Sequence, residues 1–324
     1  MQGSVNGSDK YNSKQVEMCV NTNKIYTVNN IKMLYTNVRS LTSGTKGEEL
    51  QVLIKTENVD VVGITETWGK ADILDSEMKI PGFKLYRKDR ATVNDKKGGG
   101  VALYVKNSLR VDECDSLNSK LCESVWCKIY AERVGHFVVG VCYRSQEADE
   151  IEMGEMFECI KLACEANRSV LIMGDFNYPD INWNMLKTDN NSYNFLKLVM
   201  DCNLEQHVSL PTRGNNILDI ILTSDLPIKD GVRILAPVAN SDHNVLIFSI
   251  DCNKGQDKEK IQLAYNQADY SAMREFVKLR LSDLEVIDMS ASTVWSHLNE
   301  VMQEAIKRLC YADQLRVNRE NHYG

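Results

Sequence analysis

Four polar side chains stand at the carboxyl ends of apolar runs that predict β-strands. Carboxylates are ligands for a hard cation and acceptors for a proton, and an amide can contact an anion without repelling it. Singly, each is more often a turn residue or helix cap, so it is their recurrence that indicates a site. Asn37 ends the run Ile31–Asn37, Glu66 ends Val59–Glu66, and Asp175 and Asn177 end Val170–Asn177.

A second group is the triplet Ser241-Asp242-His243, which precedes the apolar run Val245–Ile250. A histidine beside a carboxylate can be oriented by it and kept protonated. A loop cap with a surface histidine explains the triplet equally well when it is taken alone.

The elements that must position these side chains follow from the hydropathy pattern. Adjacent strands mix with strand–helix–strand units, which favours an α/β (α+β) fold: a four-layer sandwich of two packed mixed β-sheets flanked by helices. The remaining predicted strands are Val101–Val105, Ser124–Tyr130, Phe137–Tyr143 and Leu218–Thr223, and the predicted helices are Glu48–Thr56, Glu152–Ala166 and Tyr193–Cys202.

Changes in composition divide the chain into three parts. Residues 1–29 are rich in Asn, Ser and Lys and predict a disordered leader, and residues 30–251 hold the main domain. Residues 252–324 begin with a polar stretch and continue with amphipathic helices near Asp269–Ser282 and Ser292–Leu309. We interpret this last part as a helical extension and as a candidate surface for a protein partner.

The composition is that of an ordinary globular protein, with 43% hydrophobic and 26% charged residues. No apolar stretch is long enough for a membrane span, and the polar start lacks a secretory signal. We expect no membrane partner, no secretion and a nuclear or cytoplasmic monomer. No C-x-x-C pair occurs among the ten cysteines, and Cys127, Cys142 and Cys159 lie in apolar runs, so we interpret them as reduced core residues.

The net charge of −7 argues against a protein that coats nucleic acid, because such binding depends on Lys and Arg that neutralise phosphates. A hydrolase can still hold DNA through a local basic loop. A solvated surface loop is an equally good interpretation of the candidate set. It comprises Arg87, Lys88, Arg90, Lys96 and Lys97.

The ordered motifs together resemble the endonuclease/exonuclease/phosphatase superfamily from about Ile31 to Ile250, and among its branches most resemble the endonucleases of LINE-type retrotransposons. Seven or more motifs in the right order form a specific signal. They are Tyr-Thr-Asn37-Val-Arg-Ser-Leu, Gly-Ile-Thr-Glu66-Thr-Trp68, Gly98-Gly99-Gly100-Val-Ala, Val-Cys-Tyr143-Arg144, Met-Gly174-Asp175-Phe-Asn177, Pro211-Thr212-Arg213, Leu-Asp219-Ile-Ile-Leu-Thr and Ser241-Asp242-His243.

The resemblance implies a Mg²⁺ site, in which Mn²⁺ can substitute, with Glu66 as its main carboxylate and with Asn37 and Asp242 beside it. Repair-type relatives often carry an acid two residues after the asparagine of the first motif. Arg39 stands there in this chain. We therefore expect fewer metal-binding carboxylates, as in the retroelement branch.

The resemblance also implies roles at the scissile phosphate. Asp175 would orient and deprotonate the attacking water, and His243, held by Asp219, would donate to a nonbridging phosphate oxygen. Asn37 would organise the site, and Asp242 would lie near the metal or the leaving group. Asn177 and Tyr143 are implied as phosphate contacts, and Arg144, Thr212 and Ser241 as contacts to the DNA substrate.

The expected function is a Mg²⁺-dependent DNA endonuclease that nicks a target and leaves the 3′ hydroxyl used to prime reverse transcription. The C-terminal part resembles the segment that links such endonucleases to a reverse transcriptase. Two alternatives stay open: a phosphatase of the same fold acting on a small phosphoester, because fold alone does not choose a substrate, and a catalytically dispensable interaction module derived from a retroelement.

Overall fold

The computed structural model describes residues 30–90, 98–119, 121–131, 134–188, 192–252, 269–282 and 290–309. The predicted leader at residues 1–29 lies outside them. The described chain divides into two compact units, Met1–Gly255 and Gln256–Gly324. No helix among these residues has the length and apolar character that crossing a bilayer requires.

The first unit contains two six-stranded sheets. In spatial order the first sheet is β11 (Ile228–Leu235), β12 (Val245–Asp251), β1 (Asn30–Asn37), β2 (Val61–Thr65), β4 (Val101–Lys106) and β3 (Phe83–Lys88). The second is β5 (Arg110–Glu113), β6 (Glu123–Ala131), β7 (Gly135–Tyr143), β8 (Val170–Asp175), β10 (Asp219–Ser224) and β9 (Glu205–Gln206).

Both sheets follow one pattern, in which a central parallel pair is flanked by antiparallel strands. The parallel pairs are β1 with β2 and β7 with β8. Each pair is joined by a helix, α1 (Lys46–Glu57) in the first sheet and α2 (Glu150–Ala166) in the second, as parallel strands require. Further along are η1 (Asp115–Leu117) and α3 (Tyr193–Asp201).

The helices begin and end where their sequences provide caps. The Asp149 side chain accepts hydrogen bonds from the backbone N–H groups of Ile151 and Glu152, at 2.9 and 2.8 Å, and so begins α2. Asn58, with φ of 50°, ends α1 in the left-handed conformation. Leu50 and Ile54, one turn apart on α1, are its buried apolar side chains.

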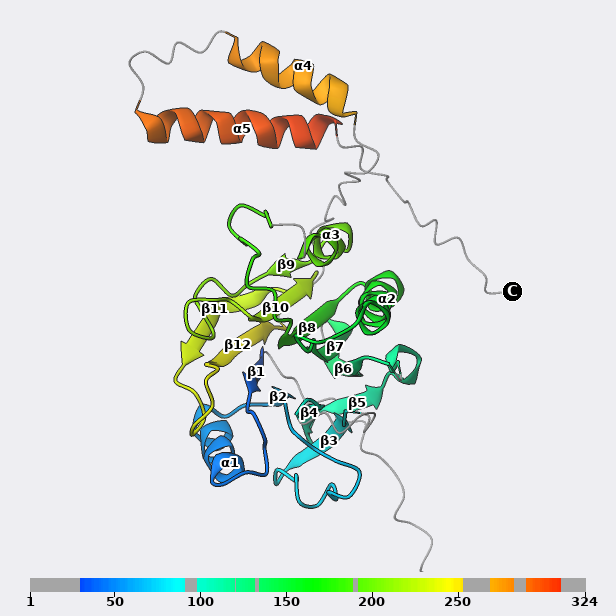
Figure 1. Ribbon diagram of the computed structural model, residues 1–324. Coiled ribbons are helices and arrows are strands. Elements are labelled where there is room, and N and C mark those ends of the chain that lie inside the picture. Colours follow the sequence, from blue (N-terminus) through cyan, green and yellow to red (C-terminus); the bar gives the residue numbers. More distant parts are fainter. Residues whose placement is uncertain are drawn as a thin grey trace, which may run out of the picture. The chain divides into compact units, whose positions relative to one another are not determined.

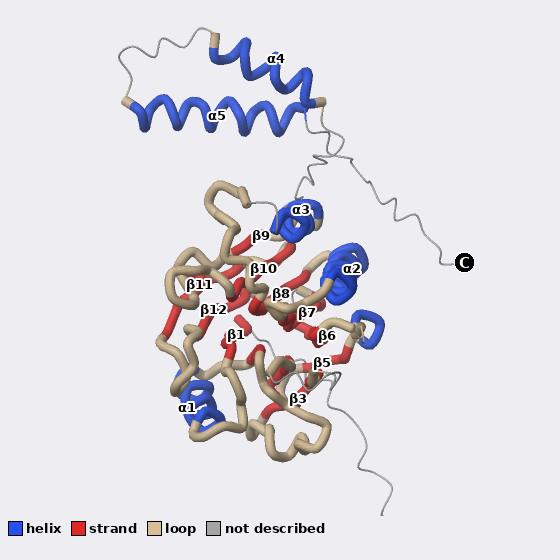
Figure 2. The backbone as a smooth tube through the Cα atoms, in the orientation of Figure 1, coloured by secondary structure: helices blue, strands red, loops and turns tan. Residues whose placement is uncertain are grey.

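Three apolar clusters bind the layers together, and they confirm the predicted four-layer sandwich. One fills the space between the sheets, with Met33, Leu103 and Phe137 among its members. A second joins α2 and α3 to the second sheet, and a third joins α1 to the first. Figure 1 shows α1 on one side of the strands and α2 with α3 on the other, and Figure 2 separates the same layers by colour.

All the described cysteines are free, and Cys127, Cys142 and Cys159 are buried. In the second unit, α4 (Tyr270–Leu281) and α5 (Ala291–Leu309) pack against each other. Asp269 caps α4 by accepting from the backbone N–H groups of Ser271 and Ala272. Arg280 and Glu304 join the two helices with an ion pair of 3.2 Å.

Candidate active site

Side chains at the carboxyl ends of the two parallel pairs meet between the sheets. Asn37 ends β1, Glu66 follows β2, and Tyr143 and Asp175 end β7 and β8. The Asn37 amide donates to Glu66 Oε1 and to Asp175 Oδ2, both at 2.9 Å. The Tyr143 hydroxyl donates to Glu66 Oε1 at 3.3 Å. Asn37 therefore connects the carboxylates of the two sheets.

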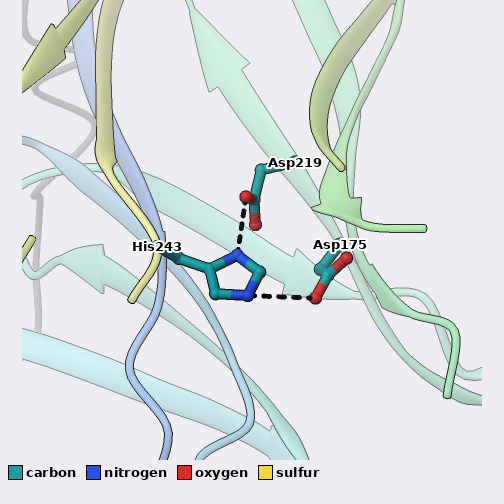
Figure 3. A group of neighbouring side chains, drawn as sticks. All are labelled: Asp175, Asp219 and His243. Carbon is teal, nitrogen blue, oxygen red and sulfur yellow. Dashed lines mark hydrogen bonds and ion pairs between the residues drawn. The ribbon is translucent and has the colours of Figure 1, made fainter. Parts of the chain in front are cut away.

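His243 lies between two carboxylates, as Figure 3 shows. Its Nδ1 is 2.7 Å from Asp219 Oδ2, and its Nε2 is 3.9 Å from Asp175 Oδ2. All three residues are buried. The bond to Asp219 fixes the ring, while Nε2 has no hydrogen-bond partner among the described residues. A buried donor without a partner is costly, so this nitrogen is suited to a group that enters the site.

The buried carboxylates of the site shift the pKa values of Asp175 and His243. Burial, followed by the charge of Asp219, raises the pKa of Asp175 to about 8. Burial opposes the imidazolium of His243, but the hydrogen bond and charge of Asp219, with the charges of Asp175 and Asp242, outweigh it and raise the pKa of His243. A buried imidazole beside a carboxyl, each with a raised pKa, is an arrangement suited to proton transfer.

Tyr35 and Thr212 hold Asp219 in place. The Tyr35 hydroxyl donates to Asp219 Oδ1 at 3.1 Å and bonds the Thr65 hydroxyl at 2.7 Å. The Thr212 hydroxyl accepts from the backbone N–H groups of Leu218 and Asp219, both at 3.1 Å. Tyr35 was not predicted, although its place two residues before Asn37 puts it on the same face of β1.

Left-handed backbone conformations gather at this end of the sheets. Glu66, Trp68 and Asn177 have φ values of 52°, 54° and 52°, and Arg39 has 44°. Such conformations are uncommon for residues other than glycine and concentrate at functional sites. At Glu66 the turn brings the side chain back to Trp68, whose Nε1 donates to Glu66 Oε2 at 3.1 Å.

Asn177 and Arg144 connect the ends of β7 and β8. The Asn177 amide donates to the Arg144 carbonyl at 2.8 Å, and its backbone N–H donates to Asp175 Oδ1 at 3.1 Å. The Arg144 guanidinium lies 4.2 Å from the ring centroid of Tyr178 and donates to the Phe176 and Asn177 carbonyls at 3.4 and 3.2 Å. Both side chains thus support the loops beside Asp175.

Thr212 and Ser241, which the resemblance implies as contacts to DNA, are both buried. Thr212 is fully buried, and Ser241 is buried with its hydroxyl donating to the Asn37 carbonyl at 2.7 Å. Both are occupied in positioning their neighbours. Asp242 is exposed, and its two carboxylate oxygens form ion pairs with Arg39 and Arg213.

Part of the candidate basic loop lies in a strand instead of a loop. Arg87 and Lys88 belong to β3, and Arg87 pairs with Asp75 at 2.8 Å and with Asp89 at 3.7 Å. Arg90 pairs with the half-buried Glu123 at 2.6 Å. These two arginines therefore form ion pairs with carboxylates of the same chain. Lys96 and Lys97 lie outside the described residues.

Glu66 fits a divalent cation. It is half-buried and accepts hydrogen bonds from the neutral donors of Asn37, Tyr143 and Trp68, with no ion-pair partner among the described residues. Such a carboxylate favours a hard cation. Ligand atoms of Asp175, Asp219 and His243 also lie within 4.8 Å of one another. The Asp219–His243 contact is already a hydrogen bond, so Glu66 is the stronger candidate.

Comparisons with known proteins agree with this architecture. Residues 137–247 match the family described as endonuclease-reverse transcriptase. The chain resembles the endonuclease domain of TRAS1, a telomere-specific non-LTR retrotransposon, at TM-score 0.54 and 17% identity, over 69% of this chain and 100% of that one. No curated protein sequence matches.

Two further solved structures share the fold. An apurinic (AP) endonuclease, LMAP, from Leishmania major has TM-score 0.54 and 14% identity over 69% of this chain and 88% of that one. A 3′ phosphatase, NExo, from Neisseria bound to a product DNA hairpin has TM-score 0.53 and 14% identity over 68% and 99%. At these identities the likeness establishes the fold.

Proposed function

We propose that the chain is a metal-dependent DNA endonuclease of the retrotransposon type, because residues 137–247 match the endonuclease-reverse transcriptase family and the fold resembles that of the TRAS1 endonuclease domain. It would nick target DNA, in the nucleus or the cytoplasm, and leave a 3′ hydroxyl. The observation that carries the proposal is the Asn37 amide, which joins Glu66 to Asp175 next to the oriented His243.

Asp175 is the proposed acceptor for the proton of the attacking water. A general base is most effective when its pKa lies near the operating pH, and the pKa of Asp175 is raised to about 8. The Asn37 amide and the Asn177 backbone N–H each bond one of its oxygens. They fix the direction in which the carboxylate faces the water.

His243 is the proposed donor to a nonbridging phosphate oxygen. Its Nε2 is buried and faces Asp175 across 3.9 Å. Asp219 holds Nδ1, and its hydrogen bond and charge raise the pKa of the ring. A donor fixed in advance stabilises the negative charge that develops in the transition state with little reorganisation.

Glu66 would hold the metal, with Asn37 and Tyr143 orienting its carboxylate through their bonds to Oε1. When bound there, Mg²⁺ or Mn²⁺ supplies Lewis-acid stabilisation of charge on the phosphate. The structure of this chain gives Asn37 a supporting part, because its amide oxygen accepts from the Arg39 backbone N–H at 3.2 Å.

Nicking of supercoiled plasmid with Mg²⁺ and with EDTA tests the proposal. Asp175→Ala and His243→Ala should each lower the nicking rate by about 10²-fold or more, because each removes a proton-transfer or charge-stabilising group. His136→Ala is the matched control, since His136 is exposed at the opposite end of β7. Absence of nicking by folded wild type would refute the proposal.

A 3′ phosphatase acting on DNA is a second candidate, which the likeness to the Neisseria enzyme favours. The same residues would serve it, because both reactions hydrolyse a phosphate ester. Release of inorganic phosphate from 3′-phosphorylated duplex, without plasmid nicking, would select this activity.

A further inference from the structure

Two arginines share one carboxylate at the edge of the site. Arg39 Nη1 lies 3.3 Å from Asp242 Oδ1, and Arg213 Nη2 lies 2.7 Å from Asp242 Oδ2. The side chains of Arg39, Arg213 and Asp242 are 46%, 35% and 37% exposed. The group is therefore open to solvent, and it carries one more positive than negative charge.

Hydrogen bonds with Lys46 and Asn37 fix the backbone around Arg39. The buried Lys46 ammonium donates to the carbonyls of Val38 and Arg39, at 2.7 and 2.6 Å. The Arg39 backbone N–H donates to the Asn37 amide oxygen. Lys46 is only 5% exposed, and a buried ammonium is costly unless it is hydrogen-bonded. Its two bonds to carbonyls therefore stabilise the turn in which Arg39 has a left-handed conformation.

Arg213 is held next to the residues that position Asp219. It follows Thr212, whose hydroxyl holds the backbone N–H of Asp219, and it forms an isolated bridge with Asn216. Arg39 thus lies two residues from the amide that joins Glu66 to Asp175, and Arg213 lies next to the residue that positions the partner of His243. Both guanidinium groups adjoin Asp242, the neighbour of His243 in the chain.

The positive charges of Arg39 and Arg213 can offset the repulsion between the carboxylates of the site and DNA. The chain has a net charge of −7, and Glu66, Asp175 and Asp219 are carboxylates that repel a polyanion. One DNA strand carries a phosphate about every 3.4 Å of helix axis, so a strand bound at the site would bring further phosphates next to the scissile one, within reach of side chains at the edge of the site. Guanidinium groups that bond a carboxylate bond a phosphate in the same geometry.

We propose that Arg39 and Arg213 form a phosphate clamp for the DNA strand being cut, and that Asp242 is the internal counterion that occupies the clamp until a phosphate displaces it. The inference rests on the proposed DNA endonuclease function. It assigns Asp242 to the clamp in place of the expected metal site.

Binding of a short fluorescent duplex in EDTA, measured by anisotropy over a range of salt concentrations, separates binding from cleavage. Arg39→Ala and Arg213→Ala should each weaken binding equally for unrelated sequences and reduce the slope of log K against log salt by about 0.9. Arg168→Ala is the matched control, because Arg168 pairs with Asp225 at the opposite end of β8. Its slope should equal that of wild type.

Asp242→Asn tests the counterion. It removes the competing carboxylate and keeps its shape, so DNA binding should be at least as tight as in wild type, and the Mg²⁺ concentration for half-maximal nicking should not change. A several-fold rise in that concentration would overturn the assignment, because it would make Asp242 a metal ligand.

The outcomes distinguish the clamp from the proposed function. If wild type nicks DNA and both arginine variants keep the wild-type slope while melting normally, the clamp is wrong and the endonuclease stands. If wild type neither nicks nor binds duplex, both are wrong. An arginine variant that fails to fold is replaced by Arg39→Gln or Arg213→Gln, which keep most of the side-chain length, remove the charge and should reduce the slope by about 0.9.

Discussion

At the scale of single residues, two aspartates of the site have pKa values that are shifted in opposite directions. Asp175 is buried beside Asp219, and burial followed by the charge of Asp219 raises its pKa to about 8. The exposed pair of Asp242 has the opposite outcome: burial opposes its charge, but Arg213, His243 and Arg39 outweigh that and lower its pKa. Local surroundings therefore distinguish the proposed proton acceptor, Asp175, from the proposed counterion, Asp242.

Asp175→Asn should change how stability depends on pH. Between its ordinary value of 3.8 and about 8, folded Asp175 holds a proton that the unfolded chain releases, so wild-type stability falls as pH rises through this window. The variant lacks that loss. In EDTA, the difference in Tm, variant minus wild type, should increase from about pH 5 to about pH 9 by at least 2–4 °C, the equivalent of about 1 kcal/mol. A constant difference would contradict the raised pKa.

Asp219→Asn should move the pH dependence of nicking. The hydrogen bond and charge of Asp219 are what raise the pKa of His243 against the effect of burial, so their loss lowers it. The rate should fall by about 10²–10⁴-fold, and the alkaline limb of the pH–rate profile should move to lower pH. Tyr35→Phe is the control, because it removes one bond to Asp219 and keeps the charge; an equal shift there would contradict the explanation.

From the residues alone, site positions were predictable where a polar side chain stands at the end of a strand, and Asp219 and His243 were expected from the resemblance. Asn37 and Asp175 end strands, Glu66 directly follows one, and the structure brings all three together. Tyr35 escaped prediction because a tyrosine inside an apolar run is usually core, and its bond to Asp219 crosses between the sheets. The burial of Thr212 was not visible either, since it depends on the turn that returns the chain to β10.

At the scale of elements, the sequence predicted the eight inner strands and none of the outer ones. The missed strands are β3, β5, β9 and β11, and these are the four sheet edges. An edge strand such as β11 is half-buried or exposed along its length, so it lacks the apolar run that identifies an inner strand. The predicted two-sheet architecture was confirmed because the inner strands define it.

Gly174→Ala should separate the two strands that carry Tyr143 and Asp175. A Cβ on Gly174 would lie 2.1 Å from the Cys142 carbonyl oxygen, which is backbone and cannot rotate away. We expect a loss of about 1–3 kcal/mol from overpacking, measured by denaturant unfolding, together with a loss of nicking.

Gly154→Ala on α2 is the matched control, because a Cβ there meets nothing within 4 Å. It should leave nicking unchanged and stabilise the helix by up to about 0.5–1 kcal/mol. Equal losses in the two variants would show that tight packing at the ends of β7 and β8 is not the cause.

At the scale of the whole molecule, the site belongs entirely to the first compact unit. The residues that build it run from Tyr35 to His243, and that unit extends to Gly255. The sequence placed a domain boundary near residue 251 from the loss of apolar runs. The α4–α5 pair forms its own unit, with Val301 and Ala305 buried between the helices.

A chain ended after Gly255 should therefore keep both fold and activity. All pairings of β12 with β1 and β11 are retained, so we expect a Tm within about 2–4 °C of the full chain, equivalent to about 1 kcal/mol, and an unchanged nicking rate. Calorimetry and the plasmid assay check this. A large loss of either would mean that α4 and α5 support the first unit.

The place of β12 in the first sheet also sets when activity can begin during synthesis. β12 is inserted between β11 and β1, pairing Asn30 with Asp251, so a ribosome must deliver the last strand of the unit before its first strand acquires this neighbour. His243 lies just ahead of that strand. Nascent chains released early would carry Glu66 and Asp175 but lack His243, on which the proposed activity depends, so premature termination should yield fragments without that activity.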